Sequence, residues 1–242
     1  MSKNLKRKIE ATLSRWKADP NRKPLVLKGV RQCGKTYSVL KFAQENYKNV
    51  VYLNFYERPE LANVFSGSLV VDELQMRLSV WMPDLPDMIP HKTVIILDEI
   101  QQCPDARTAL KFFKIDGRYD VIATGSLLAV SGYSSDITSV PVGYETLEQM
   151  VPMDFEEFLW ANGISEDATA LLRTCLSNEV PVPDWLHDRM RDLFRQYIVV
   201  GGMPEAVSTF VSRRNFSAVE KIQRDLLESY RADMIKYADK QF

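Results

Sequence analysis

Cysteine and histidine are scarce in this sequence of 242 residues. The cysteines are Cys33, Cys103 and Cys175, all far apart, and the histidines are His91 and His187. A zinc site built from these residue types needs closely spaced pairs, and a disulfide framework needs cysteines in even number. The sequence therefore predicts neither, and any bound metal should have oxygen ligands.

A long apolar run and an excess of one charge are absent as well. No stretch reaches the ~20 apolar residues that cross a bilayer, and the polar start MSKNLKRKIE precedes no signal-peptide core. Lysine and arginine total 31 against 32 acidic residues, which excludes a global attraction to nucleic acid or acidic lipid. We expect a cytoplasmic protein that does not contact membranes.

Positive charge gathers only near the N-terminus, over residues 1–24. Within this segment, Leu5, Ile9, Leu13 and Trp16 follow a period close to ~3.6 residues, so residues 3–17 are predicted to form an amphipathic helix. A charge run of this kind is typical of a solvated helix face. We expect the basic side chains to face water, with a local nucleic-acid contact as the alternative.

Short apolar runs alternate with helical patterns over the first part of the chain. Patterns typical of strands cover 25–27, 50–55, 93–99 and 119–126, and helical patterns cover 38–47 and 72–81. The last two runs are apolar almost throughout, as in parallel strands that are buried on both faces. The alternation predicts an α/β fold, a parallel sheet flanked by helices, with its ligand site at the carboxyl edge.

Helical patterns dominate after about Pro152. They cover 154–163, 166–177 and 184–202, and a last one runs from Phe216 to the end. We therefore predict a core domain over residues 1–152 and a smaller helical lid domain over 153–242. Since no stop signal closes the last helix, we expect the chain to be part of a longer protein.

The strongest motif lies between the first predicted strand and the next helix. It matches the pattern G-x-x-x-x-G-K-[ST] of phosphate-binding loops, with Gly29, Val30, Arg31, Gln32, Cys33, Gly34, Lys35 and Thr36. In such a loop backbone N–H groups wrap a phosphate, the lysine reaches the β- and γ-phosphates, and the hydroxyl binds Mg²⁺. The motif predicts a P-loop that holds ATP and Mg²⁺, and we add Tyr37 to its cofactor-binding residues.

Cys33 lies inside this loop, close to the start of the predicted helix. A helix N-terminus and a neighbouring lysine both favour a thiolate. One interpretation is that Cys33 is the fastest thiol toward alkylation and is covered by bound nucleotide. The alternative is that its small side chain packs beneath the loop, as buried free cysteines often do.

A second motif, VIILDE, places Asp98 and Glu99 at the end of an apolar strand. Burial of two carboxylates costs several kcal/mol unless a cation or hydrogen bonds compensate for it. We expect Asp98 to hold Mg²⁺ and Glu99 to orient or deprotonate the attacking water. The alternative, a pair of surface carboxylates at a strand end, is disfavoured by the P-loop.

Ser126 ends the apolar run over residues 119–126, in the sequence Ala-Thr-Gly-Ser. Its hydroxyl is placed where it could sense the γ-phosphate, and Thr124 could share that role. The alternative is a hydroxyl in a turn, because Gly-Ser is common in turns.

Five stretches together resemble one known family. They are LVLKGVRQCGKTYSVLKFA, VIILDEIQQCP, VIATGSLLAV, VPVGYETLEQMVPMDFEEFLWA and YIVVGGMPEAV. They resemble the bacterial and archaeal AAA+ ATPases that carry a C-terminal domain of unknown function. The resemblance implies an AAA+ core with a helical lid and a nucleotide-sensing residue at Ser126.

The stretch that contains Met203 and Pro204 is similar to the glycine-proline motif of STAND signalling ATPases. This similarity implies that both residues contact adenine from the lid. An equally good alternative is that the preceding glycines end one helix and Pro204 starts the next.

Two departures from the family pattern stand out. Relatives often carry an arginine where Tyr144 follows Gly143, and no arginine occurs from Gly132 to Leu172, so no arginine finger is assigned there. Relatives also continue past the equivalent of Phe242 into a domain that resembles a restriction endonuclease, which is expected to be missing here.

The main hypothesis is an enzyme that hydrolyses ATP with Mg²⁺ and couples hydrolysis to conformational change, with DNA or protein as partner of the full-length protein. The alternative is a STAND-like switch with little turnover. A GTPase is disfavoured because no glycine follows Asp98 in DEIQ and no N-K-x-D motif occurs. A small-molecule kinase stays open but lacks a recognisable acceptor pocket.

Overall fold

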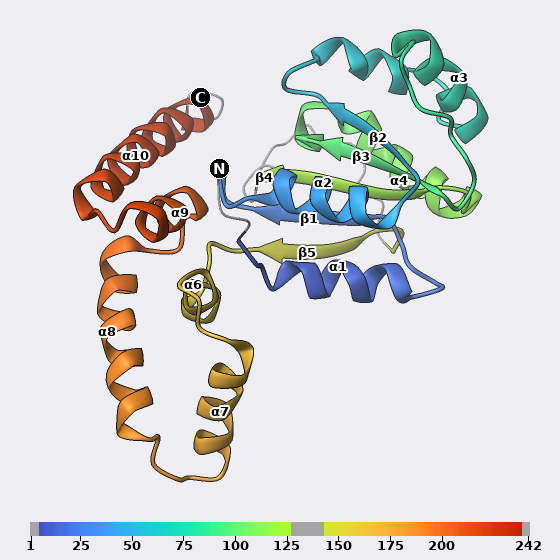
Figure 1. Cartoon of the computed structure of the whole chain (residues 1–242). Coiled ribbons are helices and arrows are strands. Elements are labelled where there is room, and N and C mark those ends of the chain that lie inside the picture. The colour runs from blue at the N-terminus through green and yellow to red at the C-terminus, as the bar shows by residue number, and fades with distance from the viewer. Residues whose placement is uncertain (1–4, 127–142, 239–242) are drawn as a thin grey trace. The chain divides into compact units, whose positions relative to one another are not determined.

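The computed structural model describes residues 5–126 and 143–238, and its chain divides into two compact units. The core unit spans Ile9–Val151, and the helical unit combines the segment up to Lys8 with residues from Pro152 onward. Figure 1 shows the elements of each unit along the chain. The proposed boundary between residues 152 and 153 stays a prediction.

The core unit contains a five-stranded parallel sheet in the order β2-β3-β4-β1-β5. Its elements are α1 (Ile9–Ala18), β1 (Leu25–Gly29), α2 (Lys35–Asn46), β2 (Asn49–Asn54), η1 (Pro59–Phe65), α3 (Val71–Trp81), β3 (Thr93–Asp98), η2 (Ile100–Gln102), α4 (Pro104–Asp116), β4 (Asp120–Ser126) and β5 (Thr146–Met150). Because β4 lies between β1 and β3, the carboxyl ends of these three strands meet at one edge. The predicted fold class is confirmed.

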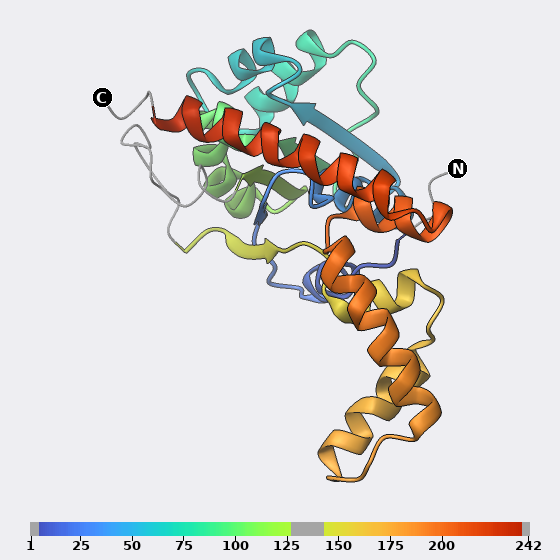
Figure 2. The ribbon, with the colours of Figure 1, turned by 90° about the vertical axis from the view of Figure 1, so that its left-hand side faces the viewer.

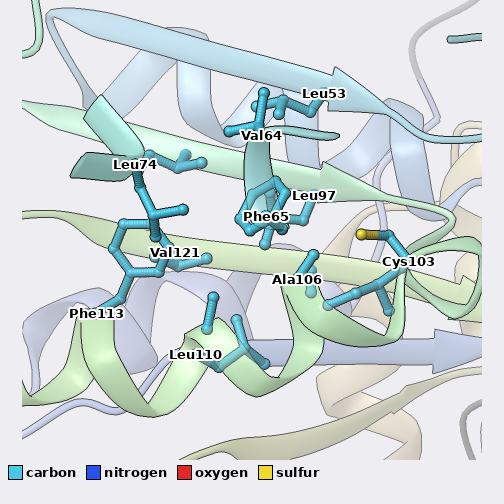
Figure 3. Close-up of a cluster of buried hydrophobic side chains, with 14 of the residues drawn as sticks. Leu53, Val64, Phe65, Leu74, Leu97, Cys103, Ala106, Leu110, Phe113 and Val121 are labelled. Atoms are coloured by element: carbon cyan, nitrogen blue, oxygen red, sulfur yellow. The ribbon is translucent and has the colours of Figure 1, made fainter. Parts of the chain in front are cut away.

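Each face of the sheet is covered by its own helices, because side chains alternate along every strand. Leu25, Leu27 and Ile96 pack with α1 and α2 on one face. Leu53, Leu97 and Val121 pack on the other with η1, α3 and α4, through Phe65, Leu74 and Phe113 among others, as Figure 3 shows. Both faces of β3 are therefore buried, which explains its continuous apolar sequence.

The helical unit contains α6 (Phe155–Ala161), α7 (Glu166–Ser177), α8 (Asp184–Val200), α9 (Pro204–Arg213) and α10 (Phe216–Ala238). Its core gathers Phe158, Leu193, Val207 and Phe210 from α6, α8 and α9. The long helix α8 leads from the turn after α7 to α9 (Figure 2). Helical patterns predicted after Pro152 are confirmed in this unit.

The prediction of a helix over residues 3–17 is wrong at its start, because α1 begins at Ile9. Residues 3 and 4 lie outside the described residues, and 5–7 are not helical. The backbone N–H of Lys8 and the Nε of Arg7 both donate to Glu157 Oε1, at 2.6 and 3.1 Å. These bonds hold the segment in the helical unit, where Leu5 packs against the apolar core.

The expectation of a solvated basic face holds for Lys6, Lys8 and Arg15, which are exposed, and is wrong for Arg7. The Arg7 side chain is buried, Lys6 pairs with Glu166, and the Lys8 ammonium lies 2.5 Å from Asp154 and 2.7 Å from Glu156. Within the described residues, these cations are therefore neutralised by the helical unit.

Two further elements were not predicted from the sequence. The strand β5 is short and carries the polar residues Glu148 and Gln149. The helix α4 begins at Pro104, and proline is tolerated there because it lies in the first turn. No helix in the described part of the chain is long and apolar enough to cross a membrane.

Candidate nucleotide site

The P-loop motif connects β1 to α2 at the carboxyl edge of the sheet. Gly34 has φ of 94° and directly precedes α2, and Gln32 has φ of 62°, so both adopt left-handed backbone conformations. Gly29 serves another purpose, because a Cβ there would lie 2.2 Å from the carbonyl oxygen of Met150 in β5. The glycines thus shape the loop and let the neighbouring strand approach.

Lys35 is the first residue of α2 and is almost fully buried. Its Nζ donates to the carbonyl oxygens of Gly29 and Val30, at 3.0 and 2.9 Å. An ammonium group has three N–H donors, so these two bonds leave one for a ligand. Lys35 therefore ties the two ends of the loop together as well as placing a charge at the site.

The Asp98 carboxylate, only 2% exposed, is the centre of a hydrogen-bond cluster at the end of β3. Thr36 Oγ1 lies 3.0 and 3.2 Å from its two oxygens, Tyr52 donates its hydroxyl at 2.7 Å, and Thr124 donates to Oδ1. Burial, reinforced by the bond to Asp98, raises the pKa of Tyr52, so this tyrosine stays a donor. The donors compensate for the burial of the charge.

Glu99 follows with φ of 55° and ψ of 46°, a left-handed conformation that is costly for a residue other than glycine. Its carboxylate is half-buried and accepts a hydrogen bond from Gln101 Nε2. Strained backbone of this kind concentrates at functional sites. Here the Glu99 side chain lines the cavity over the P-loop, and Gln101 holds one of its oxygens.

Ser126 and Thr124 end β4 between the strands of the P-loop and of Asp98, and they have different surroundings. Thr124 is bonded to Asp98, whereas the buried Ser126 Oγ has no hydrogen-bond partner among the described residues. A buried hydroxyl without a partner is uncommon and calls for an unseen ligand or water. The Ser126 hydroxyl is therefore available to a bound group.

A cavity of about 390 Å³ opens over the P-loop. It is lined by Arg31, Gln32, Gly34, Lys35, Thr36, Tyr37, Tyr56 and Glu99. Within the described residues, no group of three or more His, Cys, Asp or Glu residues could hold a metal. Mg²⁺ fits the oxygens of Thr36 and Asp98 only if phosphate and water complete its shell, which is its usual mode of binding.

Met203 and Pro204 belong to the helical unit. There Gly201 ends α8 with φ of 72°, and Pro204 starts α9. A Cβ on Gly202 would lie 2.1 Å from the Met153 carbonyl oxygen, so close packing explains this glycine. The helix-capping alternative is confirmed, and the adenine contact stays a prediction.

Two further sequence-based predictions concern Cys33 and the segment without arginine. Cys33 is fully buried, with its Sγ 3.7 Å from the Met150 carbonyl oxygen, which favours packing beneath the loop over high reactivity. Residues 132–142, the start of the segment without arginine, lie outside the described residues.

Sequence reasoning missed Tyr52, Tyr56 and Gln101. Gln101 stands two residues after Glu99, which is a weak local signal. Tyr52 gave none, because its contact with Asp98 depends on the pairing of β2 with β3.

A family model described as an AAA domain matches residues 21–159, more than half of the chain. The chain belongs to this family. The resemblance inferred from the motifs is thereby confirmed, and membership indicates an ATPase-type nucleotide-binding domain. A second model, described as a domain of unknown function, matches residues 191–241 of this AAA protein. No curated protein matches the sequence significantly.

Solved structures match this AAA protein at low sequence identity. The Walker-type ATPase PABY2304 of Pyrococcus abyssi matches with a TM-score of 0.50 and 15% identity, over 98% of this chain and 76% of that chain. AMPPCP-bound DnaA from Aquifex aeolicus matches with a TM-score of 0.47 and 10% identity, over 94% and 68%. ORC2 of Aeropyrum pernix, solved as ADPNP-ADP complexes, matches at 0.45 and 15%, over 67% and 52%, so this chain spans about half of it. The first match supports the P-loop fold.

Proposed function

We propose that this AAA protein binds ATP with Mg²⁺ and hydrolyses it to ADP and phosphate, and that hydrolysis drives a change of conformation. The proposal rests on one observation. The P-loop, the hydroxyl of Thr36, the buried carboxylate of Asp98 and the strained Glu99 converge on one edge of the sheet, beside a single cavity.

Phosphate binding is assigned to the loop. The N-terminus of α2, a helix of 12 residues, directs its free N–H groups and partial positive charge toward the cavity. Lys35 adds its remaining N–H, and Arg31 is the other cation among the lining residues. Together these groups offset the charge of a triphosphate.

Thr36 and Asp98 would hold Mg²⁺, which supplies charge neutralisation on the phosphate oxygens when bound. The hydroxyls of Tyr52 and Thr124 keep the Asp98 carboxylate in place by donating one hydrogen bond to each of its oxygens. The carboxylate also contacts Thr36, which is one of the residues that line the cavity.

Glu99 would act as the base that accepts a proton from the attacking water. Gln101 holds one oxygen of Glu99, and the other is left to orient the water. Ser126 would sense the γ-phosphate, since its buried hydroxyl has no partner in the described protein.

The second candidate function is an ATP-dependent switch with little turnover. It is favoured by the small number of cations at the site. Among the described residues, Arg31 and Lys35 are the only cations that line the cavity, and residues 132–172 contain no arginine. A trans-acting cation from a DNA-bound or protein-bound assembly would then be needed for fast hydrolysis.

Steady-state hydrolysis by the Glu99→Gln variant tests the proposal. We expect ATP affinity to be retained and hydrolysis to fall by about 10²-fold, the usual scale for loss of a general base. The parent should be measured with and without duplex DNA. Equal hydrolysis by parent and variant would refute the enzyme, and a parent that binds ATP without turnover would favour the switch.

A further inference from the structure

β2 is an outer strand of the sheet and pairs on one side only, with β3. The N–H groups of Asn49 and Phe55 donate to carbonyl oxygens of Lys92 and Asp98, both at 3.2 Å, so odd-numbered residues of β2 face β3. Backbone groups alternate in direction along a strand. Val50 and Tyr52 therefore direct their N–H and C=O groups toward the free edge.

A second cavity of about 390 Å³ runs along this edge. It is lined by Val50, Val51, Tyr52, Arg58, Trp81, Met82, Pro83, Asp84, Leu85 and Pro86. The far wall is formed by residues 82–86, which follow α3. There the Met82 N–H donates to the Leu78 carbonyl oxygen and the Leu85 N–H to that of Met82. Among the described residues, no backbone group of residues 82–86 bonds to the backbone of β2. Beyond these lining residues, the Asn49 side chain donates to the Asp87 carbonyl oxygen at 2.5 Å. We call this cavity the edge groove.

The edge groove offers three features to a ligand. They are the free backbone N–H and C=O groups of β2, an apolar surface and one charge without an ion-pair partner in the described protein. Trp81 is 38% exposed, and Arg58 is neutralised by Glu60 at 2.8 Å. Asp84 forms no ion pair with any residue that the structure describes. An occupant needs alternating backbone donors and acceptors to match Val50 and Tyr52, and a cation to match Asp84.

We propose that the edge groove binds an extended peptide segment of a partner protein, which adds to the sheet as a strand beside β2. Backbone bonds to Val50 and Tyr52 provide affinity. A lysine or arginine of the peptide pairs with Asp84, and an apolar side chain covers Trp81. Free strand edges are templates for this mode of pairing, and the cavity lies along such an edge.

Tyr52 links the edge groove to the candidate nucleotide site. The backbone of Tyr52 lines the groove, and its hydroxyl donates to Asp98 at 2.7 Å. A strand bound beside β2 restrains Tyr52 and thereby Asp98. Peptide and MgATP should therefore alter each other's affinity by the same factor. This coupling rests on the proposed function, whereas peptide docking does not.

The docking test uses a phage library of random ten-residue peptides, selected on the full chain without nucleotide, followed by calorimetry with synthetic copies of the enriched peptides. Val50→Pro removes one ladder N–H at a strand edge, where proline is tolerated. It should weaken binding by about tenfold, as for one lost hydrogen bond, whereas Val50→Thr keeps the donor and should bind as the parent does. Asp84→Asn, outside the strand, should weaken binding of basic peptides similarly.

Hydrogen exchange gives a readout at the groove itself. Bound peptide should slow exchange of the Val50 and Tyr52 amides. Failure to enrich peptides, equal binding to Val50→Pro, or unchanged exchange at both amides would overturn the proposal. Slower exchange with rising protein concentration alone would also overturn it, because a second copy would then be the occupant.

The coupling is tested with Tyr52→Phe, which retains the backbone but not the hydroxyl. Peptide affinity should persist in this variant, and the effect of the peptide on MgATP affinity should vanish. If the peptide leaves MgATP affinity unchanged in the parent, the coupling is refuted. Because docking is measured without nucleotide, a failure of the proposed ATPase function would not be mistaken for a failure of docking.

Discussion

Two buried carboxylates, one in each unit, are compensated in different ways. Glu157 of the helical unit accepts from the Arg7 guanidinium, from the Lys8 N–H and, through its other oxygen, from the Asp154 N–H at 3.1 Å. These donors are fixed by the backbone or by a buried ion pair. Asp98 of the core unit is held chiefly by hydroxyls, which can rotate and accept other partners.

The difference shows what separates a structural carboxylate from a candidate metal ligand. The Glu157 cluster belongs to a capping box at the start of α6 and closes on itself. The Asp98 cluster shares Thr36 with the lining of a cavity, and the neighbouring Ser126 hydroxyl is left without a partner in the described protein. Burial of charge alone does not identify a site, whereas exchangeable donors beside a cavity do.

The largest effect on stability is expected from Glu157→Ala, which leaves Arg7 buried without its carboxylate. Breaking a buried ion pair costs about 3 to 5 kcal/mol. Denaturant unfolding should show this loss. The control, Glu166→Ala, breaks an exposed pair with Lys6 and should cost less than about 1 kcal/mol. If both variants lost the same free energy of unfolding, the buried Glu157 cluster would contribute no more to stability than the exposed pair.

Lys35→Ala should lower ATP affinity by about 10²-fold, because hydrogen bonds to charged groups contribute ~1.5 to 3 kcal/mol each. Some stability should also be lost, since Lys35 ties Gly29 and Val30 together. Calorimetry with ATP is the measurement. Lys41→Ala, on the same helix but paired with Glu10 away from the loop, is the matched control. Equal ATP affinity in the parent and in Lys35→Ala would refute the assignment of the loop to ATP binding.

Thr124→Val should destabilise the core unit by about 1.5 to 3 kcal/mol, the range for a hydrogen bond to a charged group. The methyl that replaces the hydroxyl leaves Asp98 short of one donor. Thermal unfolding without nucleotide measures the loss. A variant as stable as the parent would show that the remaining hydroxyls suffice.

Ser126→Ala should change stability by less than about 0.5 kcal/mol, because its hydroxyl has no partner in the described protein to lose. Its effect should appear only with nucleotide, as slower hydrolysis at similar affinity for ADP. The pair Thr124→Val and Ser126→Ala therefore separates a residue that serves the fold from one that serves the ligand. A stability loss in Ser126→Ala would assign this hydroxyl to the fold instead.

Much of the core unit could be predicted because its signals are local. The apolar runs of β1, β2, β3 and β4 and the glycine-lysine pattern of the loop each occupy a few consecutive residues. The strand β5 was not predicted because its five residues include the polar Glu148 and Gln149. The helix over 3–17 was predicted to start too early because periodicity does not show what a segment packs against.

The sequence by itself determined the family, the loop and the pair Asp98 and Glu99, since backbone conformation and phosphate chemistry constrain neighbouring residues directly. Only the tertiary structure decided that Tyr52 holds Asp98, that Arg7 belongs to the helical unit and that Cys33 lies buried beneath the loop. These contacts join residues far apart in the chain. Their partners are selected by strand order and by the packing of side chains, and neither leaves a periodic trace in the sequence.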